Sequence, residues 1–198
     1  MTNNELLALV PPALAEADAV ARRSADRELS RGSSISCRKG CDACCRYLVR
    51  LSLPEVLHLR RVLEALPEPR RAEAWARFAA AREKLAEEDL LHDLETGLAR
   101  GENDPGHDHR VETLARRYLA LRIPCPFLVL EEGCCGIYPD RPAPCRQHLV
   151  SSPAELCRDP FTENVRLVPL QRNLRDELVR SAARITDGSE HVVPLVLI

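Results

Sequence analysis

Four cysteines fall within nine residues in the stretch CRKGCDACC. Closely spaced thiolates repel one another, and a soft or borderline cation relieves the repulsion, so such clusters typically bind zinc, copper(I) or iron–sulfur clusters. The candidate ligands in this stretch are Cys37, Cys41, Cys44 and Cys45. Because adjacent side chains tend to point in different directions, Cys44 and Cys45 favour two metals or a polynuclear centre over one ion held by both.

The other five cysteines follow after 79 residues that contain none. They are Cys125, Cys134, Cys135, Cys145 and Cys157. Two cysteine segments separated by helical sequence predict one site assembled from both ends of a helical hairpin. Zinc requires four ligands in a tetrahedron, so eight thiols could serve two zinc sites, or one [4Fe–4S] cluster with ligands to spare. The dense, all-thiolate set without paired C-x2-C knuckles favours iron–sulfur, and zinc remains the alternative.

Length and composition limit the classes of function. A chain of 198 residues can bury a core without help from disulfides or metals. Its net charge of −2 and its aromatic content of 4% give no support for nucleic-acid binding. The N-terminus lacks a basic region and carries Glu5 and a Pro-Pro pair, which argues against a secretory signal, and no apolar run approaches the ~18 residues of a membrane span. We therefore expect a cytoplasmic protein without membrane association, in which clustered cysteines bind metal instead of forming disulfides.

Helical periodicity dominates the sequence outside the cysteine segments. Ser52 and Glu55 fit a capping box, with Pro54 in the first helical turn. The predicted elements are a helix over 4–29 with Pro11-Pro12 near its start or breaking it, helices over 53–66 and 69–98, a loop over 101–109, a helix over 110–121, an irregular segment over 124–161, a helix over 173–185 and an extended tail that could form an edge strand. The predicted fold class is mainly α, a helical domain with irregular cysteine-rich loops organised around a metal site.

The pattern divides the chain into three segments. Residues 1–35 form an N-terminal helix and linker, and 36–160 form a cysteine-cluster metal-binding domain with a helical hairpin insert. Residues 161–198 form a C-terminal helix and an extended tail, which we expect to pack on the same domain.

The cysteine segments together resemble a known family. C37-RKG-C41-DA-C44-C45, then C125-PFL, then C135-GIYPDRPAP-C145-R, are similar to the YkgJ-type cysteine-cluster proteins, described as zinc- or iron-chelating CxxxCxxCC domains. The resemblance covers roughly residues 36–160. It implies the ligand set Cys37, Cys41, Cys44, Cys45, Cys125, Cys135, Cys145 and Cys157. It also implies that Cys134 is an extra thiol, because the family requires no cysteine there.

The resemblance extends to residues around the predicted ligands. Arg141, Pro142 and Arg146 belong to the shared motif. We expect Pro142 and Pro144 to stiffen the loop that presents Cys145, and Tyr138 to pack over the site.

Two function classes follow. The first is a metal-binding protein whose iron–sulfur or zinc centre serves electron transfer, metal handling or structural support, with an unknown protein or redox partner. The alternative is an iron–sulfur-dependent modifying enzyme, because a larger relative, flagellin lysine-N-methylase, carries the same cysteine motif. No catalytic residue can be named, since no nucleotide-binding or hydrolase motif appears.

Other candidates are weaker. The spacing of Cys37, Cys41 and Cys44 matches that of radical S-adenosylmethionine enzymes, but the chain is short for their barrel and lacks alternating strands and helices. His148 is a possible additional ligand close to Cys145, and His107 and His109 are more typical of a solvated loop.

Overall fold

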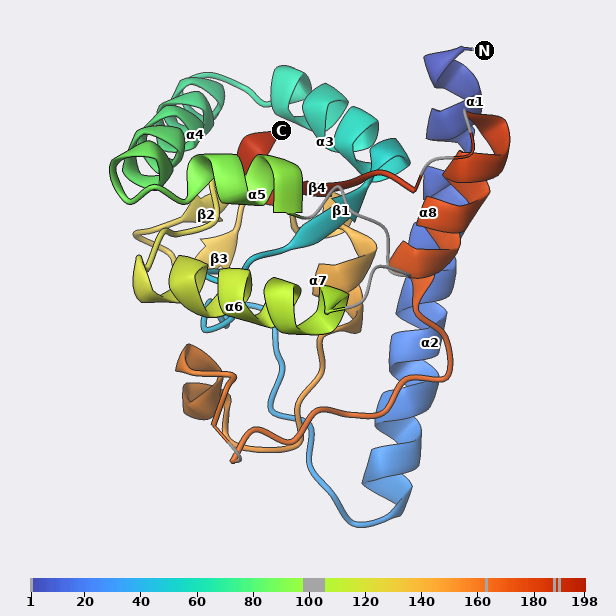
Figure 1. Cartoon of the computed structure of the whole chain (residues 1–198). Helices are drawn as coiled ribbons and strands as arrows, with labels where there is room; N and C mark the ends of the chain where they lie inside the picture. The colour runs from blue at the N-terminus through green and yellow to red at the C-terminus, as the bar shows by residue number, and fades with distance from the viewer. Residues whose placement is uncertain (1, 98–105, 163, 187, 189) are drawn as a thin grey trace.

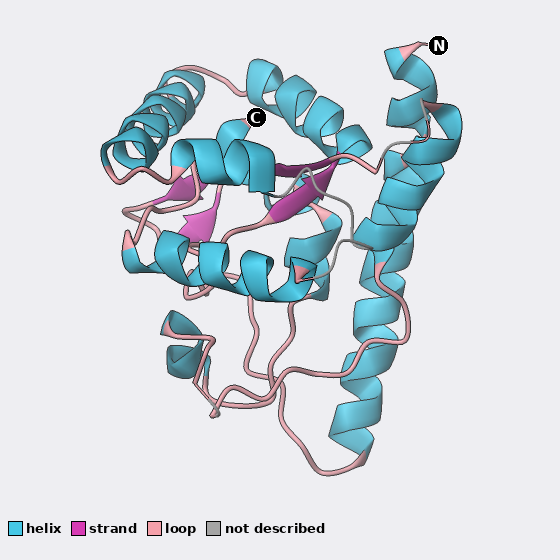
Figure 2. Cartoon of the chain, in the orientation of Figure 1, coloured by secondary structure: helices cyan, strands magenta, loops and turns pink. Residues whose placement is uncertain are grey.

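Helices on two sides enclose two short sheets in this protein. The computed structural model of the chain describes residues 2–97, 106–162, 164–186, 188 and 190–198. In Figure 1, helices α3 to α6 surround the strands on one side, and the long helix α2 lies beside α8 on the other. Figure 2 shows how little of the described chain is strand, so the prediction of a mainly α fold is confirmed.

The N-terminal helical segment consists of two helices, α1 (Asn3–Ala8) and α2 (Val10–Ser30). The predicted single helix over 4–29 is therefore wrong, and of the two predicted placements of Pro11-Pro12 the break is the one found. Both prolines lie in the first turn of α2, where a missing N–H breaks no helical hydrogen bond. Helix α2 packs against α7 and α8 through a small buried cluster.

Helix α3 (Leu53–Ala65) begins with the predicted capping box. The Glu55 carboxylate accepts hydrogen bonds from the backbone N–H and the hydroxyl of Ser52, at 3.0 and 2.7 Å. The helix stops before Pro67, because Leu66 is extended.

The predicted single helix over 69–98 is wrong. The chain forms α4 (Arg70–Glu87) and α5 (Leu91–Gly97), separated by a turn in which Asp89 has a φ of 51°. This left-handed turn brings Leu90, which is 1% exposed, into a cluster shared by both helices. Burial of that leucine outweighs the helix propensity of the intervening residues.

Helix α6 (His107–Ala120) begins earlier than predicted. The predicted loop over 101–109 is wrong at its end, because 107–109 are helical, and 101–105 lie outside the described residues. Gly106 precedes the helix with a φ of 83°, a conformation that glycine adopts without strain.

Two antiparallel pairs of strands connect distant segments. Strand β1 (Arg50–Ser52) pairs with β4 (Val192–Pro194), with Leu51 opposite Val193. The prediction of an edge strand in the tail is therefore confirmed for β4, after which Leu195–Leu197 turn into a 3-10 helix, η3.

The segment predicted to be irregular contains only short elements. They are β2 (Leu128–Val129), β3 (Cys134–Cys135), the 3-10 helix η1 (Tyr138–Asp140), α7 (Ala143–Gln147) and the 3-10 helix η2 (Ala154–Arg158), followed later by α8 (Leu174–Ile185).

The largest buried cluster connects the helices to the cysteine segments. Leu51, Leu59 and Phe78 from β1, α3 and α4 contact Phe127 and Ile137, and Cys125 and Cys135 pack against the same cluster. The rings of Phe78 and Phe127 meet edge to face at 5.5 Å. The second cysteine segment is thus anchored on the apolar core.

Two further observations concern the organisation of the chain. Helix α8 and strand β4, from the C-terminal segment, contact β1 and α3. The division into three segments stays a prediction. None of the described helices has the length and apolar character needed to cross a membrane.

Candidate metal centre

Successive turns shape the first cysteine loop. The backbone N–H of Cys41 donates to the Arg38 carbonyl at 3.2 Å, and that of Cys45 donates to the Asp42 carbonyl at 2.9 Å. Gly40, with a φ of 87°, supplies the left-handed residue that this winding requires.

A backbone hydrogen bond joins the two cysteine segments. The N–H of Cys125 donates to the carbonyl of Cys45 at 2.7 Å, although the two residues are far apart in sequence. Helix α4 holds the second segment from the other side, because Arg77 Nε donates to the Pro126 carbonyl at 2.8 Å. The two cysteine segments, at the two ends of the helical region, are therefore adjacent, while the assembly of one metal site from both stays a prediction.

The small β2–β3 sheet separates two adjacent cysteines. Cys135 pairs with Leu128 and Cys134 with Val129, and successive side chains of a strand point to opposite faces. Cys135 lines the central cavity, whereas the Sγ of Cys134 lies 3.2 Å from the exposed carboxylate of Glu132.

Helix α7 presents Cys145, and a buried carboxylate fixes its start. Glu55, which is 1% exposed, accepts a hydrogen bond from the Ala143 N–H at 2.8 Å in addition to its bonds with Ser52. Burial raises the pKa of Glu55, and its hydrogen bonds oppose that shift. Sequence analysis gave Glu55 only a capping role, because nothing in the sequence placed α7 beside α3.

Arg146 binds the loop before α7 to the N-terminal helix. Its Nε donates to the Arg141 carbonyl at 2.7 Å, another nitrogen donates to the Pro139 carbonyl, and Nη1 forms a 2.5 Å ion pair with Asp18 of α2. This motif arginine thus orients the segment that carries Tyr138 and Arg141.

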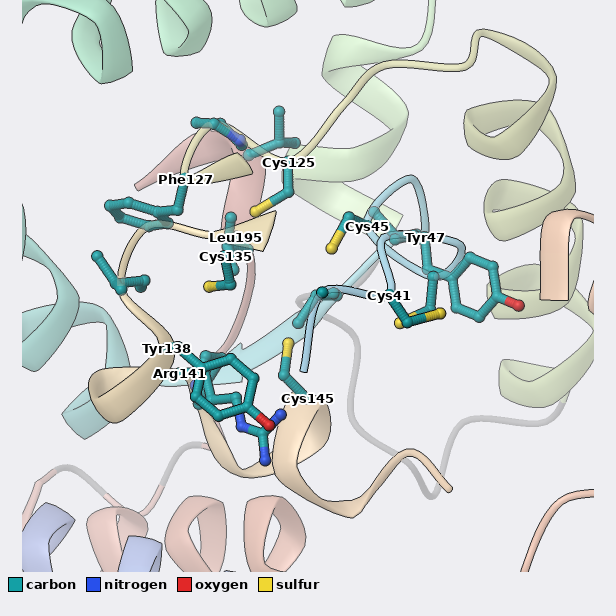
Figure 3. A pocket seen from close by; sticks show the side chains of 18 of the residues that line it. Cys41, Cys45, Tyr47, Cys125, Phe127, Cys135, Tyr138, Arg141, Cys145 and Leu195 are labelled. Atoms are coloured by element: carbon teal, nitrogen blue, oxygen red, sulfur yellow. The ribbon is translucent and has the colours of Figure 1, made fainter. Parts of the chain in front are cut away.

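Six cysteines line one half-enclosed cavity of about 90 Å³ (Figure 3). They come from the first loop, from the turn before β2, from β3 and from α7. They are Cys41, Cys44, Cys45, Cys125, Cys135 and Cys145. Apolar side chains complete much of the wall, including Tyr118, Phe127 and Leu195, and Arg38, Tyr138 and Arg141 contribute the polar part.

Cys37 and Cys157 lie outside this lining. They pack with Cys41, Tyr47 and Val150 in a neighbouring cluster. The Sγ of Cys37 accepts a hydrogen bond from the Val150 N–H at 3.3 Å. The Tyr47 hydroxyl donates to the Cys157 carbonyl at 2.5 Å. Cys41 belongs to both groups, so all eight predicted ligands form one continuous region.

The environment of the cavity raises the pKa of four of its thiols, those of Cys44, Cys125, Cys135 and Cys145. Burial raises the pKa of Cys125 to about 12 and raises that of Cys135. Burial, followed by the charges of Cys125, Cys44 and Cys135, raises the pKa of Cys145 well above its usual value. The pKa of Cys44 is raised first by its contact with Cys45 and then by burial. A bound cation would lower the pKa of these thiols, since a thiol that coordinates a metal is deprotonated outright.

The donor set fits a thiolate-bound metal centre in its chemistry. Among the described residues, no three Cys, His, Asp or Glu side chains converge closely enough for one ion. The six cavity thiols instead surround a common space. Which of the predicted cysteines are ligands stays a prediction.

The histidines lie apart from the cavity. His148 packs edge to face against Tyr47 at 5.3 Å, and burial lowers its pKa. His107 is 7% exposed at the start of α6. Neither lines the cysteine cavity, but the Nε2 atom of His148 is buried without a hydrogen-bond partner among the described residues, so its role as an additional ligand stays a prediction.

Comparison with known proteins places the cysteine segments in a described domain. The family model CxxCxxCC, described as "Putative zinc- or iron-chelating domain", matches residues 36–164. In this chain three residues separate the first two cysteines of the motif. No curated protein and no solved structure matches the chain significantly.

Proposed function

Because the chain belongs to the CxxCxxCC family of zinc- or iron-chelating domains, we propose that its cysteine cavity holds a polynuclear iron–sulfur centre. One observation carries the proposal: six cysteine side chains, drawn from separated segments, line a single cavity. When bound, the metal would supply the positive charge that stabilises the thiolates, and an iron–sulfur centre would also accept and release an electron.

The spread of the thiols favours several metal atoms over one. A single tetrahedral zinc ion needs four ligands at about 2.3 Å from the metal. The described residues offer no such gathering of even three donors, while six thiols surround the cavity. A centre of several metal atoms satisfies more thiols across a wider space. Two zinc ions sharing the eight cysteines remain the competing occupant.

The surroundings support a role in electron transfer or metal handling. Apolar side chains such as Phe127 and Leu195 line much of the cavity beside the cysteines. A low-polarity shell and nearby positive charge are the means by which proteins set a cluster's potential. The partner would be a redox protein or a metal-accepting protein.

One feature favours the alternative of a modifying enzyme. The cavity is only half enclosed, so a small molecule or a protein side chain could approach the metal. An open coordination position would then support chemistry at the centre, whereas a closed all-cysteine shell would not.

The test is anaerobic purification followed by absorption spectroscopy and by assays of iron, zinc and inorganic sulfide on the same sample. We expect iron and sulfide in comparable amounts, with a broad visible absorption band. A colourless protein with stoichiometric zinc and no sulfide would overturn the iron–sulfur proposal.

A matched pair of variants tests the location. Cys135→Ser removes a cavity thiol and should lose most of the metal. Cys134→Ser changes the adjacent thiol on the opposite face and should keep it. Equal loss from both variants would contradict the proposed site.

A further inference from the structure

Arg141 is a cation in the wall of the cysteine cavity, with a buried donor that lacks a partner. Its guanidinium lies over the ring of Tyr138, with the Cζ atom 4.1 Å from the ring centroid. Figure 3 shows the stacked pair beside Cys145. The Nε atom of Arg141 is buried, and no hydrogen-bond partner for it occurs among the described residues.

No carboxylate neutralises this charge within the described part of the chain. Arg146, five residues further on, forms an ion pair with Asp18 at 2.5 Å, but no ion pair to the Arg141 side chain occurs in these ranges. Three thiols lie within electrostatic reach of Arg141. Its charge acts on Cys37, Cys44 and Cys135, where it opposes the effect of burial on their pKa values.

Such an arrangement is costly unless something negative occupies the cavity. A buried charged donor without a partner destabilises a fold by more than a buried neutral donor does. Four thiolates on Zn²⁺, or on an oxidised [4Fe–4S] cluster, carry a total charge of about −2. That charge, with sulfur atoms as acceptors, is what Arg141 lacks in the chain alone.

We propose that Arg141 is the charge-compensating residue of the metal centre, with its N–H groups directed at metal-bound sulfur and its guanidinium held in place by Tyr138. This inference rests on the proposed function. It explains why an arginine suits the position, because a planar guanidinium stacks on an aromatic face and also presents a fixed fork of donors. A lysine there would keep the charge but lose the stacked geometry.

Arg38 provides a matched comparison. It also lines the cavity, but its side chain is exposed, so water and salt screen its charge. Arg38→Gln and Arg141→Gln therefore each remove one positive charge from the cavity. The first removes a solvent-exposed charge, and the second removes a half-buried one.

The experiment measures metal retention and stability together. Wild type, Arg141→Gln and Arg38→Gln, each loaded with metal, are titrated with a chelator, and the metal-free forms are melted under reducing conditions. We expect Arg141→Gln to lose metal at about 10- to 100-fold lower chelator concentration, and Arg38→Gln to change little. The metal-free Arg141→Gln protein should melt at or above the wild-type temperature, because it loses a half-buried cation whose Nε atom has no partner among the described residues.

A purely structural role predicts the opposite pattern. If Arg141→Gln lowered the melting temperature of the metal-free protein as much as that of the loaded protein, the proposal would be overturned. Equal metal loss from the two variants would also overturn it. A wild-type protein that binds no metal would refute the proposed function and this inference together, whereas metal retention by Arg141→Gln refutes the inference alone.

If Arg141→Gln fails to fold, variants of Tyr138 provide a second test of the same inference. Tyr138→Leu leaves the cation but removes the ring beneath it, and should weaken metal retention in the same direction by a smaller factor. Tyr138→Phe keeps the ring and should match wild type. No difference between these two variants would overturn the positioning role of Tyr138.

Discussion

Cys145 and Cys37 are both predicted ligands, but their sulfur atoms differ in hydrogen bonding. The Cys37 thiol accepts a hydrogen bond from the Val150 N–H and lies 3.5 Å from the His148 carbonyl. The Cys145 thiol has no hydrogen-bond partner within the described ranges, and burial together with neighbouring charges raises its pKa strongly. The chain itself provides a hydrogen-bond partner for the Cys37 sulfur, whereas a bound cation would have to stabilise that of Cys145.

The largest expected effect separates these two cysteines directly. Cys145→Ser should abolish most metal binding, because it removes a thiol from the centre of the cavity lining. Cys37→Ser should retain more, since a serine oxygen can still accept the Val150 N–H. Metal per chain after gel filtration measures both. Equal loss of metal from the two variants would show that Cys37 and the cavity cysteines contribute equally to one metal centre.

A second expected effect concerns the carboxylate that fixes α7. Glu55→Ala should lower the free energy of unfolding by about 3 kcal/mol, because it leaves the buried N–H of Ala143 and the cap of α3 without an acceptor. Denaturant unfolding of the metal-free protein measures the change. Metal binding should weaken as well, since α7 carries Cys145.

Glu5→Ala is the matched control for that measurement. Glu5 occupies the same capping-box position at the start of α1, but it is exposed. Its loss should cost less than about 1 kcal/mol and leave metal content unchanged. If the two variants were equally destabilised, the bond from Ala143 to Glu55 would contribute nothing beyond an ordinary cap.

The smallest expected effect is a pH dependence of the metal-free protein. Thiols whose pKa is raised by folding stabilise the folded state below their unfolded pKa of about 8.5, and this contribution is lost as pH rises toward the folded value. The melting temperature of the reduced, metal-free protein should therefore fall from about pH 8 upward.

Cys145→Val and Cys37→Val sharpen that comparison. The fall of the melting temperature with rising pH should be less steep in Cys145→Val than in Cys37→Val, because the pKa of Cys145 is raised more strongly by burial. A melting temperature that rises with pH in the metal-free wild type would contradict the assignment of protonated thiols in the cavity.

Local sequence signals predicted much of the fold. The capping box of Ser52 and Glu55 and the proline-marked start of α2 depend on neighbouring residues, so they were visible in the sequence. The turn at Asp89 was not, because the burial of Leu90 against distant leucines decides it. Tertiary packing overrode a strong local preference for helix.

The candidate site shows the same limit. Spacing and family resemblance identified the cysteines, but not which of them share a cavity. The outward position of Cys134 follows from a two-residue strand, too short to leave a periodic pattern. The shared motif includes Arg141, but the sequence could not show its special feature, a buried donor without a partner among the described residues.

The hydrogen bond from Cys125 to Cys45 has a consequence for the order of assembly. It closes the base of a hairpin whose intervening 79 residues include most of the largest apolar core. The entropy lost on closing such a long loop is thus offset in part by the polypeptide's own packing and hydrogen bonds. We therefore expect the reduced, metal-free chain to fold, with metal loaded afterwards.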